Sequence, residues 1–158
     1  MKNMSPHFLS FLTRWIHVAG MAALLGGSLL LWIFSARWKE EPSGQYSRVF
    51  LQVAASFEIL FWSAVGLLVL TGIGNLGAFG AGLPGLETAW GRNLALKLGL
   101  VLVLALFSLP RSLLVARLEI AEETAGFTRL RPLFLRLYAA TTILSLAILY
   151  LAVSLAHG

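Results

Sequence analysis

Four long apolar stretches constrain the fold of this chain more than any other feature of its sequence. They cover about 11–35, 50–73, 93–110 and 133–156, and each reaches roughly the 20 residues that a helix needs to cross the hydrocarbon of a bilayer. With 58% hydrophobic and only 12% charged residues, the chain has too little polar surface to coat a soluble domain. We therefore predict an all-α integral membrane protein in which residues 1–158 form a single four-helix transmembrane bundle surrounded by lipid.

The distribution of lysine and arginine predicts how the spans are oriented. Basic residues gather after the first span and between the third and fourth spans, and segments of this kind usually face the cytoplasm. We therefore predict a multi-pass protein of the cell inner (plasma) membrane with both chain termini on the outer or periplasmic side. The basic residues that support this orientation are Arg37, Lys39, Arg48, Arg111, Arg117, Arg129, Arg131 and Arg136.

The composition excludes several classes of function. The chain has no cysteine, so disulfides, iron–sulfur clusters and thiolate metal sites are excluded. Its net charge of +5 does not indicate nucleic acid, because the basic residues lie at the ends of apolar runs instead of in one patch. The letters Gly72-x-Gly74-x-x-Gly77 match a dinucleotide fingerprint, but the preceding strand and the soluble βαβ unit that such a site requires are missing.

Glycine and proline predict where the helices are interrupted. The glycine-rich stretch TGIGNLGAFGAGLPGLETAWG (71–91) should break the helix between the second and third spans. Pro110 should kink or end the third span. The sequence SLLVARLEIAEETAGF (112–127) has helical spacing, and we predict either an interfacial helix or a helical extension of the third span.

Ionisable residues inside a membrane are costly to bury and are therefore candidates for function. His17 and Lys97 lie at similar depths near the predicted outer side. A neutral imidazole is a common ligand of metals and of haem iron, and a histidine in a helix can equally be a hydrogen-bonded packing residue. A buried lysine can offer a lone pair to a metal, or it can extend its charge to the interface.

Glu58 is the only carboxylate well inside a predicted span, and the chain has no aspartate to pair with it. A mechanism that uses two carboxylates is therefore excluded. Glu58 lies roughly 10 Å from the cytoplasmic end of the second span, so a salt bridge to Lys97 requires both long side chains to close an axial gap. A proton relay, a polar link between helices and a neutral buried acid all stay open as its role.

Further candidates lie at the outer ends of the spans. Arg14 and Arg92 could pair with anionic groups such as porphyrin propionates, or they could anchor the helices to lipid headgroups. His157 follows the fourth span and is a reserve ligand for a metal or haem iron, while His7 precedes the first span. If neither of these two histidines binds a metal, both are solvated.

Three segments of the sequence resemble a known group of membrane proteins. They are RWIHVAGMAALLGGSLLLW (14–32), LTG (70–72) and WGRNLALKLGLVLVLAL (90–106). Together they resemble the small membrane proteins that contain a copper resistance protein D (CopD) domain and the HemJ-type protoporphyrinogen oxidases. In the HemJ-type branch, a histidine of the first helix and a lysine of a later helix are associated with haem b. The resemblance therefore implies a bundle in which His17 and Lys97 bind haem iron.

The same resemblance leaves the activity open. HemJ-type enzymes have a run of tryptophan, alanine and glycine followed by LPR after the first-helix histidine, whereas this chain has AALLGGSLLLW. The CopD name implies copper, but copper transporters present clusters of methionine, cysteine or histidine. This chain has only Met1, Met4 and Met21, and Met4 with His7 forms at most a sparse outer copper site.

Three functions follow from these residues. The one that we prefer is a haem b protein, a b-type cytochrome with an electron-transfer or redox role, which requires a redox partner or another membrane subunit. The second is a membrane oxidoreductase that oxidises a porphyrinogen, and the third is a non-catalytic or copper-handling membrane subunit. Assembly into a homo-oligomer is compatible with each of them.

Overall fold

The computed structural model describes residues 6–37, 45–77, 85–120 and 124–157. These residues form four long helices and no strand: α1 (Pro6–Ala36), α2 (Gln45–Gly77), α3 (Ala89–Ile120) and α4 (Thr124–His157). Each helix is long and apolar enough to cross a membrane. The prediction of an all-α membrane protein with four spans is therefore confirmed.

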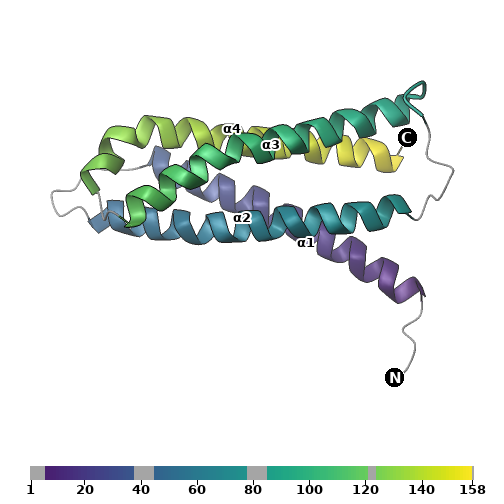
Figure 1. Cartoon of the computed structure of the whole chain (residues 1–158), viewed down its shortest axis with the longest axis horizontal. Coiled ribbons are helices and arrows are strands. Elements are labelled where there is room, and N and C mark those ends of the chain that lie inside the picture. The colour runs from purple at the N-terminus through teal and green to yellow at the C-terminus, as the bar shows by residue number, and fades with distance from the viewer. Residues whose placement is uncertain (1–5, 38–44, 78–84, 121–123, 158) are drawn as a thin grey trace.

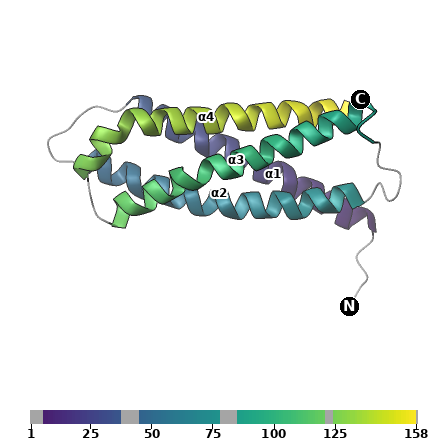
Figure 2. The ribbon, with the colours of Figure 1, turned by 45° about the horizontal axis from the view of Figure 1, so that its top comes forward.

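The four helices run up and down along one axis and form an antiparallel bundle (Figure 1). α1 packs against α2 and α4, and α3 packs against α4, whereas α2 has a smaller contact with α3. α1 begins and α4 ends at the same end of the bundle in both ribbon views (Figure 2). We call this end the outer end and the opposite end the inner end, after the predicted orientation; which side of the membrane each end faces stays a prediction.

The third span is longer than the sequence predicts. α3 does not end at Pro110 but continues to Ile120 as one helix. Proline removes one backbone hydrogen bond, but Val115 and Leu118 beyond it are buried in the bundle and hold the following turns in place. This part of the chain is therefore an extension of the third span with one face packed against its neighbours.

The glycine-rich stretch breaks the helix later than predicted. α2 continues through Gly72 and Gly74 and ends at Gly77, because a helix satisfies its own backbone hydrogen bonds and lipid offers no other partner for them. α4 begins at Thr124 and likewise contains a proline, Pro132. Residues 78–84, where the predicted break continues, lie outside the described residues.

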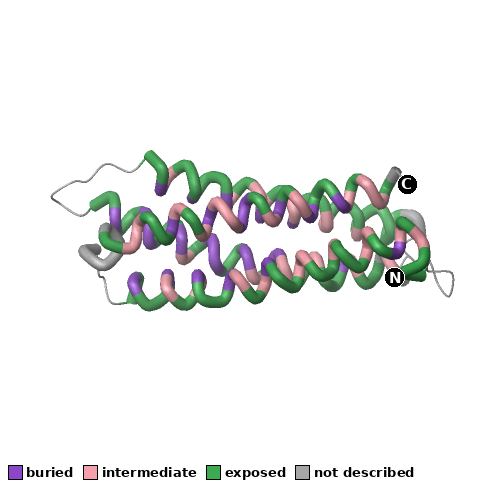
Figure 3. Tube along the Cα trace, turned by 90° about the horizontal axis from the view of Figure 1, so that it is seen from above, coloured by how far each residue is buried: buried purple, intermediate pink, exposed green. Residues whose placement is uncertain are grey.

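One face of each helix lines the core, as the buried segments of the tube in Figure 3 show. Towards the inner end the core is aromatic: the ring of Phe50 packs edge-on against Phe134 and Tyr138, and Phe57 packs against the same tyrosine. The opposite faces of the helices carry exposed leucine, isoleucine and valine side chains. This distribution is the one expected when lipid replaces water around the bundle.

A glycine allows α1 to lie against an aromatic ring of α2. A Cβ atom placed on Gly27 would collide with the ring of Phe57, whereas a Cβ atom on the adjacent Gly26 would meet nothing within 4 Å among the described residues. Small residues commonly bring membrane helices together in this way. Gly27 is therefore a packing residue, and Gly26 offers a matched control on the same helix.

We predict that Gly27→Val destabilises the bundle by about 1–3 kcal/mol, which is typical of overpacking a filled core. Gly26→Val introduces the same side chain on the lipid-facing side and should have a much smaller effect. Unfolding of both variants by sodium dodecyl sulfate in mixed micelles, followed by circular dichroism, measures the difference. Equal losses of stability would contradict the proposed close packing.

Candidate functional site

The ionisable residues inside the bundle belong to two polar groups at different depths. The outer polar group consists of His17 on α1, Thr71 on α2 and Lys97 on α3. The inner network lies towards the other end and is centred on an ion pair between α2 and α3. Its members are Glu58, Trp62, Arg111, Ser112, Tyr138 and Thr141.

In the outer polar group, a hydrogen bond fixes the ring of His17. Its Nδ1 atom lies 2.7 Å from the hydroxyl oxygen of Thr71, and the same hydroxyl lies 2.7 Å from the carbonyl oxygen of Leu67. A threonine hydroxyl has one proton, and donating it to the carbonyl makes His17 Nδ1–H the donor to Thr71. The lone pair of His17 Nε2 is then free to bind a metal, which is the arrangement found in most metal-binding histidines.

The surroundings of His17 are small or apolar on the side of α2. A Cβ atom on Gly72 would lie 3.9 Å from His17 Cε1, an ordinary van der Waals contact, so the backbone of α2 lies beside the ring. One turn further along α1, the backbone of Gly20 lies against the side chain of Leu68. The sequence therefore brings α1 and α2 close together here without covering the imidazole, which stays half-buried.

Lys97 belongs to the same level of the bundle. Its charge is close enough to His17 to interact with the imidazole electrostatically, although the two residues come from helices that lie diagonally across the bundle. The lysine is half-buried, and within the described part of the chain its ammonium group has no hydrogen bond or ion pair. The two candidate ligands thus lie at the same level of the bundle, on opposite helices.

The other outer candidates lie at the surface or outside the described residues. Arg14 is exposed. Arg92 is also exposed, and its Nη1 donates a hydrogen bond of 3.0 Å to the carbonyl oxygen of Glu87. His7 and His157 are residues of α1 and α4, but their side chains lie outside the described part of the structure.

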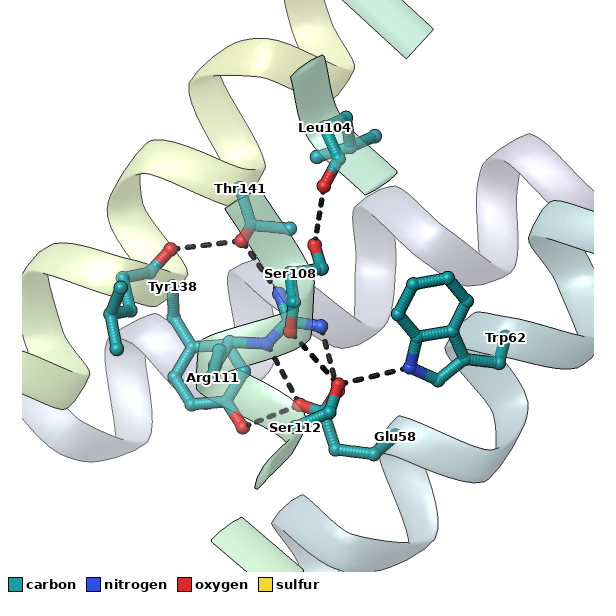
Figure 4. A network of polar contacts seen from close by, with 9 residues as sticks. Glu58, Trp62, Leu104, Ser108, Arg111, Ser112, Tyr138 and Thr141 are labelled. Carbon is teal, nitrogen blue, oxygen red and sulfur yellow. Dashed lines mark hydrogen bonds and ion pairs between the residues drawn. The ribbon is translucent and has the colours of Figure 1, made fainter. Parts of the chain in front are cut away.

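The inner network is built around Glu58, which pairs with Arg111 and not with Lys97. Two parallel hydrogen bonds, each of 2.8 Å, join the guanidinium Nε and Nη2 atoms to the two carboxylate oxygens (Figure 4). Arg111 is 0% exposed and Glu58 is 7% exposed. Lys97 lies fourteen residues from Arg111 along α3, or about 21 Å along the helix axis, which is too far for the salt bridge considered from the sequence.

The remaining hydrogen bonds of the network connect this ion pair to three helices. The hydroxyl of Ser112 donates to Glu58 Oε2 at 2.5 Å, and Tyr138 donates to Oε1 at 3.2 Å. Trp62 donates to the oxygen of Ser112, and Arg111 Nη1 donates to Thr141 at 2.6 Å. Figure 4 shows that these side chains converge from α2, α3 and α4.

Aromatic rings surround the guanidinium group. The Cζ atom of Arg111 lies 4.6 Å from the ring centre of Phe61 and 5.1 Å from that of Tyr138, which are favourable distances for cation–π contacts. Buried apolar side chains close the space above and below the network, with Leu24 and Leu104 on the outer side and Phe50 and Phe134 on the inner side. The network therefore links α2, α3 and α4 around a buried ion pair, with Trp62 and Ser112 partly exposed at its edge.

Sequence reasoning missed the role of Arg111, which it counted as a charge of the cytoplasmic loop. That assignment was wrong, because α3 extends past Pro110 and Arg111 lies inside the bundle. One signal was present in the sequence: a carboxylate within a span requires a cation at the same depth. Arg111 and Glu58 both lie towards the inner end of their helices and satisfy this requirement.

Comparisons with known proteins match most of the chain to one family. The family described as CopD, Copper resistance protein D, matches residues 51–155, about two thirds of the 158 residues. No curated protein and no solved structure that we compared matches the chain. The matched segment contains α3 and almost all of α2 and α4, including Glu58 and Arg111, but it begins after α1 and therefore does not include His17.

We predict that each half of the ion pair depends on the other. Glu58→Gln would leave a buried guanidinium without a counter-charge, and Arg111→Met would leave a buried carboxylate, so each should cost about 3–5 kcal/mol. The double variant removes both charges and should be more stable than either single variant.

A double-mutant cycle measured by unfolding in mixed micelles tests this coupling. Arg117→Met removes an exposed arginine from the same helix and should have little effect. A double variant whose loss equals the sum of the two single losses would show that the pair is not coupled.

Proposed function

The chain belongs to the copper resistance protein D family, and from that premise we propose that this member binds haem b through His17 and has an electron-transfer or other redox role in the membrane. The observation that supports the proposal best is the hydrogen bond between His17 Nδ1 and Thr71. It orients the imidazole and leaves Nε2 as the free donor atom, as haem and metal ligation require.

The donor atoms on the described residues suit haem better than a bare copper ion. No group of three histidine, aspartate or glutamate side chains lies together in that part of the chain, whereas a copper ion bound by protein alone generally needs several such donors. A porphyrin already supplies four nitrogen ligands, so one or two protein ligands are sufficient. His17 meets this smaller requirement.

The neighbouring residues have distinct roles in this proposal. Lys97 lies within electrostatic reach of His17 and would be the second ligand or the positive charge that attracts an anionic edge of the ligand. Arg92 lies at the outer end of α3 with an exposed guanidinium, where it would pair with propionate groups. Leu68 and Met21, which are partly buried against the core, would exclude water from the imidazole.

Bound haem b would supply a one-electron carrier whose potential depends on burial and on nearby charge. If Lys97 is protonated and does not bind the iron, it would raise that potential, because a positive charge favours the reduced form of the iron. A redox partner or another membrane subunit would exchange the electron. We propose the inner (plasma) membrane as the location of these roles, because the chain has four apolar helical spans.

We predict that purified protein in detergent gives a reduced-minus-oxidised absorption spectrum of b-type haem, with a stoichiometric pyridine haemochrome. His17→Ala should abolish this signal, while His7→Ala, the matched control near the start of α1, should leave it unchanged. Lys97→Met should alter the spectrum if the amine is the second ligand, and His157→Ala should alter it if the reserve histidine has that role.

Thr71→Val gives a sharper test, because it removes the hydrogen-bond acceptor and keeps the shape of the side chain. Loss of such a partner weakens metal binding by about 10–100-fold. Thr13→Val is the control, since the hydroxyl of Thr13 bonds only to the carbonyl of Leu9 on its own helix among the described residues. A protein that binds no haem after expression with added haem would refute the proposal.

Copper handling is the second candidate, favoured by the description of the family. His17 and Met21 are four residues apart on one face of α1, and imidazole with thioether donors suits Cu(I). In this case we predict that the protein competes with bicinchoninate for Cu(I), and that His17→Ala and Met21→Leu both weaken the competition. Binding that neither substitution changes would exclude this pair as the site.

A further inference from the structure

Packing between α2 and α3 loosens from the inner end to the outer end. On α2, Glu58 and Val69 lie on the same face about three turns apart, but the exposed fraction rises from 7% at Glu58 to 46% at Val69. On α3, Leu104 is only 4% exposed, whereas Leu100 and Lys97 further outward are half-buried. The faces that meet at the inner network therefore separate towards the outer end.

The other helices remain packed further out. On α4, Ile148 and Leu151 are still buried, although they lie two to three turns outward of Thr141. No residue of α3 between Gly91 and Leu104 is buried. The loosening therefore involves α3 and the outer part of α2, and these two helices also have the smallest contact between neighbouring helices.

Hydrogen bonds show the same asymmetry. Near the outer end, the bond between His17 and Thr71 ties α1 to α2, and the bond from Trp90 to the carbonyl of Leu155 ties α3 to α4. Between α2 and α3, the hydrogen bonds made by Trp62, Arg111 and Ser112 belong to the inner network. Near the outer end, hydrogen bonds thus tie α1 to α2 and α3 to α4. The bonds of the inner network between α2 and α3, and those from Thr142 and Arg131 of α4 to α1, lie further inward.

We propose that the outer half of the boundary between α2 and α3 is the path by which a lipid-soluble tetrapyrrole reaches His17 from the outer leaflet. This inference rests on the proposed function. A flat, apolar ring with carboxylates at one edge can move through the bilayer with its charged edge at the surface. On this path it meets Lys97 and His17 Nε2 in the interior and the exposed Arg92 at the outer end.

The inner network makes this opening feasible without unfolding the bundle. The Glu58–Arg111 pair holds α2 and α3 together towards the inner end. The outer halves of these two helices can therefore move apart while the ion pair stays formed. Membrane helices have no hydrophobic driving force that pulls them together in lipid. Helix contacts without polar ties are therefore the ones that open at the lowest cost.

Cross-linking tests the path. Because the chain has no native cysteine, only the introduced thiols can react. Val69→Cys with Val101→Cys places one thiol on each side of the boundary, about three turns outward of the ion pair, for reaction with a flexible bis-maleimide. The control is Thr13→Cys with Gly74→Cys across α1 and α2, where a Cβ atom on Gly74 would lie 3.9 Å from Thr13 Cγ2.

We expect the α2–α3 cross-link to slow the uptake of added haem by about tenfold or more, because it blocks the conformational change that binding by this path requires. The α1–α2 cross-link should not change uptake, and protein loaded with haem before cross-linking should keep its spectrum. Equal uptake with and without the α2–α3 cross-link would overturn the path and leave the proposed function standing. Absence of haem binding in the protein without cross-links would overturn both.

A second measurement tests the opening without haem. Spin labels at Val69 and Val101 report the outer boundary, and labels at the exposed residues Val53 and Arg117 report the inner one. Electron–electron double resonance should give a broader distribution of distances for the outer pair than for the inner pair. Equally narrow distributions would show that the boundary is closed along its whole length and would overturn the proposal.

Discussion

The ion pair between Glu58 and Arg111 is the interaction on which the arrangement of the helices depends. Charges removed from water are tolerated only when each is paired and its remaining hydrogen-bonding atoms are satisfied. Here the guanidinium bonds to both carboxylate oxygens and to Thr141, while Ser112 and Tyr138 supply further donors to Glu58. A shift of one helix by a turn would leave both charges unpaired, so the pair fixes the register of α2 and α3 and positions α4 beside them.

This constraint divides the bundle into two halves with different properties. In the inner half, aromatic and aliphatic side chains pack around the network. The outer half has fewer buried residues on α2 and α3, and it contains His17 and Lys97 in half-buried positions. In lipid, contacts between apolar helix faces are not favoured over contacts with lipid. The ion pair can therefore hold the inner ends of α2 and α3 together while their outer ends pack more loosely. A ligand site and its access path both require such packing.

The sequence predicted the parts of the structure that depend on one helix at a time. The length of the apolar stretches alone identifies the four spans. The predicted second and third spans were too short, because we expected the helices to break at Gly72, Gly74 and Pro110. In lipid the helices continue past these residues, since a helix satisfies its own backbone hydrogen bonds. The contact of Glu58 with Arg111 depends on the register between two helices, which hydropathy does not contain. The His17–Thr71 hydrogen bond was missed for the same reason, since a threonine near a span end carries no signal of its partner.

The relation between the family and the candidate site follows from where the match begins. It covers residues 51–155, so it contains the scaffold of the inner network but not α1 and its histidine. A fold supports many chemistries, and the chemistry is decided by the donor atoms placed on it. In the function that we propose, those atoms are the oriented imidazole of His17 and the amine of Lys97. Two donor atoms are too few to hold a bare metal ion firmly. They are sufficient for a porphyrin, which supplies four ligands of its own. The donor atoms therefore favour haem, whereas the description of the family alone favours copper.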